Sequence, residues 1–202
     1  MKEFNIVLAG VGGQGILLAA EILGTAAIKD KLNVRVSELH GMAQRGGAVV
    51  SNVRIGEKVL APTVLEGQAD VLVGFEPLET LRNLKFASEK TLVIMNTEII
   101  FPTELTVEMM KCPSLVEIQE KIRHFTKKII AVEAAELAKK AGSILAENIV
   151  LIGVLAASEK MPVRKESILE ALQELIPPKH LGVNAKAFEL GYEYVKKGKI
   201  TF

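Results

Sequence analysis

Two glycine-bearing stretches of the sequence have the composition of ligand-binding loops. The first, GVGGQG at residues 10–15, lies between a short apolar run and a longer one. The second, SELHGMAQRGG at residues 37–47, adds an imidazole, an amide and a guanidinium to its glycines. Because glycine has no Cβ and adopts positive φ readily, it lets the backbone bend tightly and lets another group approach it. Both stretches are therefore candidates for contact with a ligand.

The flanks of the first stretch predict its place in the fold. Residues 4–9 form a nearly continuous apolar run, typical of a strand covered on both faces, and residues 16–28 are long enough for three helical turns. The glycines therefore lie at a strand-to-helix turn. At such a turn the unpaired N–H groups and the positive end of the helix dipole converge, so a phosphate or carboxylate binds without a basic side chain.

The second stretch offers side chains whose roles the sequence leaves open. If the first two strands are neighbours, both loops leave the carboxyl edge of the sheet. Arg45 then clamps an anion bidentately beside Gly46 and Gly47, or it is a solvated loop residue and the glycines only turn the chain. His40 is the only histidine expected near this edge of the sheet, and it is either a general base or a hydrogen-bonded loop residue. Gln14 either donates its amide to a ligand or covers the helix start.

Alternating strand-like and helix-like periods predict the elements that hold these loops. We expect strands at residues 4–9, 34–39, 48–55, 59–64, 70–75, 92–95 and 127–132, with a hairpin about the turn at 56–58. The helices expected after the first are those beginning at residue 77 and at residues 115–125, 133–141, 148–158, 163–175 and 184–197. The predicted fold class is α/β: a three-layer α/β/α arrangement with a mixed, mostly parallel sheet and a Rossmann-like glycine-rich first turn. No repeat or linker divides residues 1–202, so we expect a single domain.

Individual residues predict where some helices begin and what they pack against. Pro77 suits a first helical position, Ser114 and Glu117 have capping-box spacing, and Asn148 is a candidate cap. The helix at 16–28 carries charge only at Glu21 between its first residue and its end. We therefore expect this helix to be buried on two faces, against the sheet and against a further element or another subunit.

Composition excludes several classes of function. The 202 residues are 49% hydrophobic with a net charge of +1 and no Trp, so the basic field that nucleic acid selects is absent. The opening residues do not resemble a secretory leader and no apolar stretch is long enough to span a bilayer, so we expect a cytoplasmic protein without a membrane segment.

The one cysteine, Cys112, allows no internal disulfide and cannot by itself hold an iron–sulfur cluster or zinc. We interpret it as a half-buried thiol.

Two interpretations remain open at this point. Gly10, Gly12 and Gly15 match G-x-G-x-x-G, and Glu38 stands where a ribose-binding acid is expected, which favours an NAD-dependent dehydrogenase. Alternatively, the chain is a scaffold whose glycines serve close packing against a partner and bind no small molecule. Motifs for zinc peptidases, dithiol chemistry, serine hydrolases and P-loop nucleotide hydrolysis are missing, so no self-contained catalytic set is present.

Taken together, GVGGQGI at residues 10–16 and ELHGMAQRGGAVVSNVRIG at residues 38–56 resemble the gamma-type subunit of the 2-oxoacid:ferredoxin oxidoreductases. The second motif is most similar to the small subunit of the indolepyruvate ferredoxin oxidoreductases. The similarity extends through NAKAFELG at residues 184–191.

This resemblance implies a subunit that is inactive alone. In the family, a 2-oxoacid is decarboxylated on thiamine diphosphate, electrons pass through iron–sulfur clusters to ferredoxin, and coenzyme A receives the acyl group. The thiamine and the clusters belong to a large partner subunit, so we expect a hetero-oligomer in which this chain helps to bind coenzyme A. No catalytic or metal-binding residue is expected here. The resemblance assigns cofactor binding to Gly12, Gly13, Gln14, Gly15, His40, Gln44, Arg45, Gly46 and Gly47.

Overall fold

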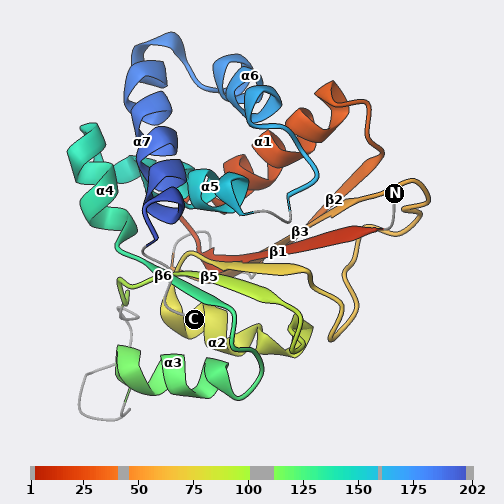
Figure 1. Cartoon of the computed structure of the whole chain (residues 1–202), viewed down its shortest axis with the longest axis vertical. Coiled ribbons are helices and arrows are strands. Elements are labelled where there is room, and N and C mark those ends of the chain that lie inside the picture. Colours follow the sequence, from red (N-terminus) through yellow and green to blue (C-terminus); the bar gives the residue numbers. More distant parts are fainter. Residues whose placement is uncertain (1–2, 41–45, 101–111, 159–160, 199–202) are drawn as a thin grey trace.

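A six-stranded mixed sheet forms the centre of the protein in the computed structural model, which describes residues 3–40, 46–100, 112–158 and 161–198. Its strand order is β2-β3-β1-β4-β5-β6 (Figure 1). The strands are β1 (Phe4–Val11), β2 (Val34–His40), β3 (Ala48–Ile55), β4 (Val71–Gly74), β5 (Leu92–Asn96) and β6 (Ile129–Val132). β1, β4, β5 and β6 run parallel, whereas β3 runs antiparallel to both of its neighbours. The predicted mixed, mostly parallel sheet is therefore confirmed.

Helices cover both faces of this sheet, which gives the three layers that the sequence predicts (Figure 1). The helices are α1 (Ile16–Lys29), α2 (Pro77–Arg82), α3 (Leu115–Arg123), α4 (Ala134–Ala141), α5 (Glu147–Ala157), α6 (Lys165–Leu175) and α7 (Pro178–Lys196). Two 3₁₀ turns, η1 (Leu84–Phe86) and η2 (Ile144–Ala146), precede β5 and α5. α2 and α3 lie on one face, and the remaining helices lie on the other (Figure 1).

The protein has two hydrophobic cores, one on each face of the sheet, and alternate side chains of β1 belong to each of them. Ile6 and Leu8 pack with α1 and the C-terminal helices, whereas Val7 and Ala9 belong to the core beneath α2 and α3. All four side chains are buried, as expected for a strand covered on both faces.

Several local predictions are confirmed. Pro77 is the first residue of α2, and Ser114 and Glu117 form both hydrogen bonds of a capping box at the start of α3. Cys112 is a half-buried free thiol. α1 is covered on its second face by α6 and α5 of the same chain, so the protein supplies this cover itself without a second subunit.

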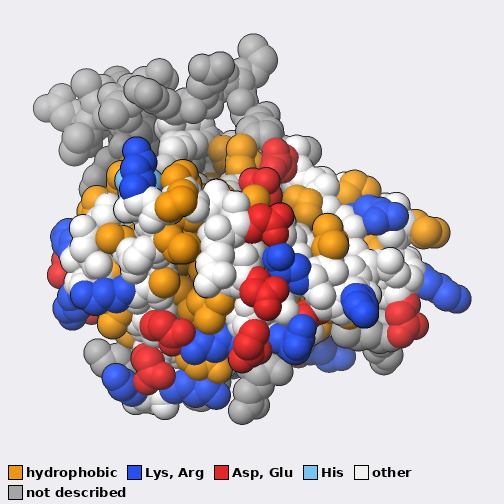
Figure 2. Space-filling model, turned by 90° about the horizontal axis from the view of Figure 1, so that it is seen from above, with side chains coloured by type: hydrophobic (Ala, Val, Ile, Leu, Met, Phe, Trp, Pro, Cys, Tyr) orange, Lys and Arg blue, Asp and Glu red, His pale blue; other side chains and the backbone are white. Residues whose placement is uncertain are grey.

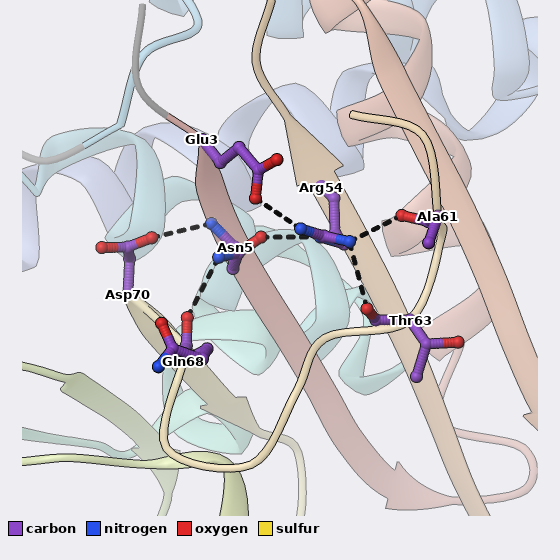
Figure 3. Close-up of polar contacts among 7 residues, drawn as sticks. All are labelled: Glu3, Asn5, Arg54, Ala61, Thr63, Gln68 and Asp70. Atoms are coloured by element: carbon purple, nitrogen blue, oxygen red, sulfur yellow. Dashed lines mark hydrogen bonds and ion pairs between the residues drawn. The ribbon is translucent and has the colours of Figure 1, made fainter. Parts of the chain in front are cut away.

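The predicted hairpin about residues 56–58 is wrong. Residues 59–64 form no strand, and β3 instead pairs with β2, to which the second glycine-bearing stretch connects it. Since β1 and β2 occupy both edges of β3, no edge is left for residues 59–64. The Arg54 guanidinium of β3 instead donates to the main-chain oxygens of Ala61 at 2.7 Å and Thr63 at 3.2 Å (Figure 3). These carbonyl groups therefore bind a side chain and do not extend the ladder.

Two helix starts also differ from the prediction. α5 begins at Glu147 after Ala146, and Asn148 lies inside the helix and does not cap it. α7 begins at Pro178, six positions before the predicted residue 184. Pro178 occupies the first turn, where its missing N–H has no intrahelical partner to lose. The double proline therefore ends α6 and also starts α7.

Charged side chains of both signs are interspersed with hydrophobic ones on the helical face of the molecule (Figure 2). In the described parts of the chain, no single helix is long and apolar enough to cross a membrane. The segments Ala134–Ala141 and Ile144–Ala157 are together long and apolar enough to span a membrane, but the chain bends by 120° between them.

The carboxylate of Asp30, just after α1, anchors α6. It accepts hydrogen bonds from the backbone N–H of Arg164 at 2.7 Å, from the Arg164 guanidinium at 2.7 Å and from the Ser167 hydroxyl. Burial acts to raise the pKa of Asp30, but the bonds from Ser167 and Arg164 outweigh it and lower the pKa. Ionised Asp30 therefore stabilises the fold at neutral pH, and this contribution is lost as the pH falls through its lowered pKa.

We expect Asp30→Asn to lower the free energy of unfolding by about 2 kcal/mol at pH 7, because hydrogen bonds to a charged group are lost. Urea denaturation of the isolated chain measures this, and the loss should shrink as the pH falls below the ordinary aspartate pKa of about 4. Glu136→Gln, which removes one partner of an exposed ion pair with Lys139, is the control and should leave the midpoint unchanged. Equal shifts for the two variants would contradict this role of Asp30.

Candidate functional site

The glycine loop (residues 10–15) connects β1 to α1 at the carboxyl edge of the sheet. Gly13 and Gly15 have φ angles of 104° and 72°, a left-handed conformation that side-chain-bearing residues rarely adopt. Gly15 is the N-cap residue of α1, and no described side chain caps this helix. A Cβ at Gly13 would meet no atom within 4 Å. The start of α1 is therefore an open helix N-terminus, which suits an anion.

The structure brings the two glycine-bearing stretches together. Gly12 N–H donates to the Gly47 oxygen at 2.8 Å, and Gly46 N–H donates to the Gly12 oxygen at 3.4 Å. The predicted adjacency of the loops is confirmed, but the assumption behind it is wrong because β3 lies between β1 and β2. The loops meet because β2 ends, and β3 begins, beside the end of β1, where Val11 pairs with Ala48.

The positions of the other predicted residues in the second stretch are only partly described. His40 is the last residue of β2 and pairs with Val49. Gln44 and Arg45 lie outside the described residues. Gly46 adopts a φ of 75°, and Gly47 contacts Gly12 as above.

The place of Glu38 weakens the dehydrogenase alternative. Glu38 lies on β2, opposite Ser51 of β3, and β3 separates it from β1. Two inter-strand spacings, about 10 Å in total, therefore lie between the strand of Glu38 and the glycine loop's strand. In a dinucleotide fold the acidic residue stands on the strand next to the glycine-rich turn.

Gln14 uses both ends of its side-chain amide within the chain. Its Oε1 accepts from Val11 N–H at 2.9 Å, and its Nε2 donates to the Phe75 oxygen at 2.8 Å. This side chain therefore ties the glycine loop to the end of β4. These bonds do not reach the N–H groups at the start of α1, so the structure shows a role for Gln14 that differs from the predicted helix cover.

Sequence reasoning missed a set of polar side chains at the same edge. They are Glu76, Asn96, Glu147 and Asn148. α1 and α2 leave the neighbouring parallel strands β1 and β4 on opposite faces, so this edge contains the crevice where ligands of open α/β sheets bind. A usable signal was present, because Glu76 and Asn96 follow or end the apolar runs of β4 and β5.

Two carboxyl groups at this edge are partly or fully removed from water. Glu76 is 1% exposed, caps α2 through Glu79 N–H at 2.8 Å and accepts from Ile100 N–H at 3.3 Å. Burial raises the pKa of Glu76 despite these bonds. Burial, and then the nearby charge of Glu98, raise the pKa of Glu147. No three His, Cys, Asp or Glu side chains of the described chain segments group as metal ligands.

A pocket of about 250 Å³ opens beside the first turn of α1. Leu18 of α1, Asn148 of α5 and His180 of α7 line it, together with mostly apolar residues of η2 and the junction of α6 and α7. A second histidine, His180, therefore lies in a pocket beside the first turn of α1, although the lining of this pocket includes no described residue of the two glycine-bearing stretches. His180 lies in the first turn of α7, which starts earlier than predicted.

The fold and site define a class of protein: an open α/β protein with paired glycine-bearing loops at one edge and no catalytic constellation among its described residues. The family model described as Pyruvate ferredoxin/flavodoxin oxidoreductase matches residues 5–194. The chain belongs to this family, and it is an oxidoreductase subunit.

Relatives agree with this assignment. The chain is 46% identical over 197 residues to "Indolepyruvate oxidoreductase subunit IorB" of Archaeoglobus fulgidus, with 98% of each chain covered. Among solved structures, the gamma subunit of a keto/oxoacid ferredoxin oxidoreductase from Geobacter sulfurreducens matches with a TM-score of 0.72, 24% identity and 98% coverage of both chains. The 2-oxoglutarate:ferredoxin oxidoreductase from Magnetococcus marinus, solved with 2-oxoglutarate, coenzyme A and succinyl-CoA, matches at 0.73 and 20% identity. The match covers 98% of this chain and 32% of that one.

We expect Gly15→Ala to destabilise the protein by about 2 kcal/mol, since alanine is disfavoured at positive φ. The added Cβ would also lie 2.4 Å from Asn148 Nδ2. Gly182→Ala in the interior of α7, where a Cβ meets nothing within 4 Å, is the matched control and should stabilise by about 0.5 kcal/mol. Thermal or urea unfolding measures both. If both substitutions are neutral, the left-handed turn at Gly15 is not required.

We expect Glu147→Gln to stabilise the protein at neutral pH. A raised pKa means that the folded state binds the Glu147 proton more tightly, so ionisation at higher pH costs stability. The amide oxygen of glutamine still accepts from Asn96 without this cost. The stability difference should be absent below about pH 4, grow through the raised pKa and then stay constant. Unfolding curves from pH 4 to 8 test this, and a difference independent of pH would contradict it.

Proposed function

We propose that this chain is the small subunit of an indolepyruvate, or other 2-oxoacid, ferredoxin oxidoreductase. The observation that carries the proposal is the 46% identity to the Archaeoglobus subunit over 98% of both chains. With one cysteine, the chain cannot by itself hold the iron–sulfur clusters that such a reaction needs. In this proposal a large partner subunit holds thiamine diphosphate and the clusters, and ferredoxin receives electrons through the complex.

We further propose that the whole chain, residues 1–202, acts as one domain whose glycine-bearing loops bind coenzyme A in the complex. Two observations support this. The uncapped start of α1 offers backbone N–H groups to phosphate oxygens, and the Gly12–Gly47 contact holds the second stretch beside that helix start. Within this proposal the residues near the coenzyme are Gly12, Gly13, Gly15, His40, Gln44, Arg45, Gly46 and Gly47. The coenzyme bound to the Magnetococcus protein makes it the ligand to test first.

In the proposed site, this chain's residues bind and orient and do not take part in bond breaking. The start of α1 neutralises negative charge, and the Arg45 guanidinium pairs with a phosphate. Thiamine diphosphate, when bound in the partner, supplies the carbanion chemistry. A pre-formed loop lowers the conformational entropy that the coenzyme must remove on binding.

Reconstitution with the large subunit tests the proposal. The isolated chain should not reduce a dye with a 2-oxoacid, whereas the complex should do so in the presence of coenzyme A. Arg45→Ala should raise the apparent KM for coenzyme A about tenfold, through the loss of a charge-assisted hydrogen bond. Arg123→Ala, at an exposed position of α3, is the control.

The outcomes separate the alternatives. No gain in rate over the large subunit alone would overturn the subunit role in catalysis. A fully active complex whose KM for coenzyme A is unchanged by Arg45→Ala would favour a scaffold. Tight binding of NADH by the isolated chain, seen as enhanced cofactor fluorescence, would favour the dehydrogenase.

A further inference from the structure

Hydrogen bonds connect the glycine loop to three other parts of the chain: the residue after β4, the end of β5 and the start of α5. Gln14 Nε2 donates to the Phe75 oxygen at 2.8 Å, just after β4. Asn96 Nδ2, at the end of β5, contacts the same oxygen at 3.3 Å and Glu147 Oε2 at 3.2 Å. These contacts form a continuous path from the glycine loop to the first residue of α5.

A second contact closes this path into a ring. Asn148 Nδ2 donates to the Gly15 oxygen at 3.3 Å. Gln14 and Gly15 are neighbours in the chain, and so are Glu147 and Asn148, so the two contacts complete a circuit. We call it the carboxyl-edge ring, and its members are Gln14, Gly15, Phe75, Asn96, Glu147 and Asn148.

Burial makes these contacts hard to replace by water. Asn96 is 1% exposed, Phe75 2% and Asn148 4%. Asn96 is fully used, because its Oδ1 also accepts from Ala134 N–H at 3.3 Å. Losing a donor in such a place leaves a buried carbonyl group without its partner, which is more costly than losing an exposed hydrogen bond.

Close packing restricts the loop further. A Cβ at Gly10 would lie 2.6 Å from Gln14 Oε1 and 2.7 Å from Phe75 Cβ, and one at Gly15 would lie 2.4 Å from Asn148 Nδ2. The loop therefore cannot shift toward these side chains.

We propose that Gln14, Asn96 and Asn148 are positioning residues, which hold the glycine loop in its ligand-binding conformation, and that Gln14 itself does not touch the ligand. This inference rests on the proposed function, since it assigns these residues to the site proposed for coenzyme A. A loop fixed before binding loses less conformational freedom on binding, so the ring raises affinity without forming contacts to the ligand.

The structure provides a matched control at the opposite edge of the sheet. Asn5 of β1 is 8% exposed, and its Nδ2 donates to the Gln68 oxygen at 3.1 Å (Figure 3). Gln14→Glu and Asn5→Asp make the same chemical change, in which an amide that donates to a main-chain oxygen becomes a carboxylate. Each keeps its acceptor, which Val11 N–H uses for Gln14 and Arg54 Nε uses for Asn5.

Hydrogen exchange on the isolated chain is the first measurement. Gln14→Glu should accelerate amide exchange in peptides that cover residues 10–18, whereas Asn5→Asp should accelerate it only near residues 54–70. Gln14→Met, which removes both polar ends without adding charge, covers the case in which the carboxylate variant does not fold. Unchanged exchange at residues 10–18 in both Gln14 variants would overturn the inference.

Kinetics of the reconstituted complex is the second measurement. Gln14→Glu and Gln14→Met should raise the KM for coenzyme A about tenfold with kcat within about twofold, because preorganisation is lost but no reacting group changes. Asn5→Asp should leave this KM within about twofold even though it also lowers thermal stability. Equal KM shifts at positions 14 and 5, or no shift at position 14, would overturn the inference and leave the proposed function standing.

A wild-type complex that turns over without coenzyme A would instead overturn the proposed function. The exchange measurement needs no ligand or partner, so it would still decide whether the carboxyl-edge ring holds the loop.

Discussion

The antiparallel course of β3 is the constraint on which the site depends. β3 pairs with β1 on one side and with β2 on the other, so it begins at the edge where both of them end. The chain therefore has to return to the end of β1 before it enters β3, and Gly46 and Gly47 arrive beside Gly12. A parallel strand in this place would carry the second loop to the opposite edge. One reversed strand thus makes two distant stretches of the sequence a single candidate site.

The polar groups at the two edges of the sheet differ in their hydrogen bonding. At the amino edge, Asn5 and Arg54 join Glu3, Asp70 and the loop after β3 in a network whose partners all belong to this chain (Figure 3). At the carboxyl edge, the Asn148 side chain donates to the Gly15 oxygen of the glycine loop, while the described residues leave the start of α1 uncapped. Since both faces of the sheet are covered by helices, an exposed array of N–H groups can occur only at an edge.

The apolar faces of the helices and the sheet are covered by other elements of the same chain. The same architecture makes up nearly all of the Geobacter gamma subunit and about a third of the Magnetococcus chain. In this protein the described elements cover the apolar faces of one another. α1 illustrates this, because its sheet-facing side packs on β2 and β3 and its other side packs on α6 and α5. The Asp30 carboxylate fastens that second contact.

Local patterns in the sequence were enough for the fold class, most element positions, the strand-to-helix turn at Gly15 and the capping box at Ser114, because each depends on residues only a few positions apart. Tertiary contacts alone decided the pairing of β3, because β1 and β2 occupy both of its edges and residues 61 and 63 bind the Arg54 side chain through their carbonyl groups. They likewise brought Asn148, 133 positions away, to Gly15 and changed it from a candidate cap into a support for the loop. No periodicity encodes such contacts, since they follow from which buried donors and acceptors meet when the layers pack.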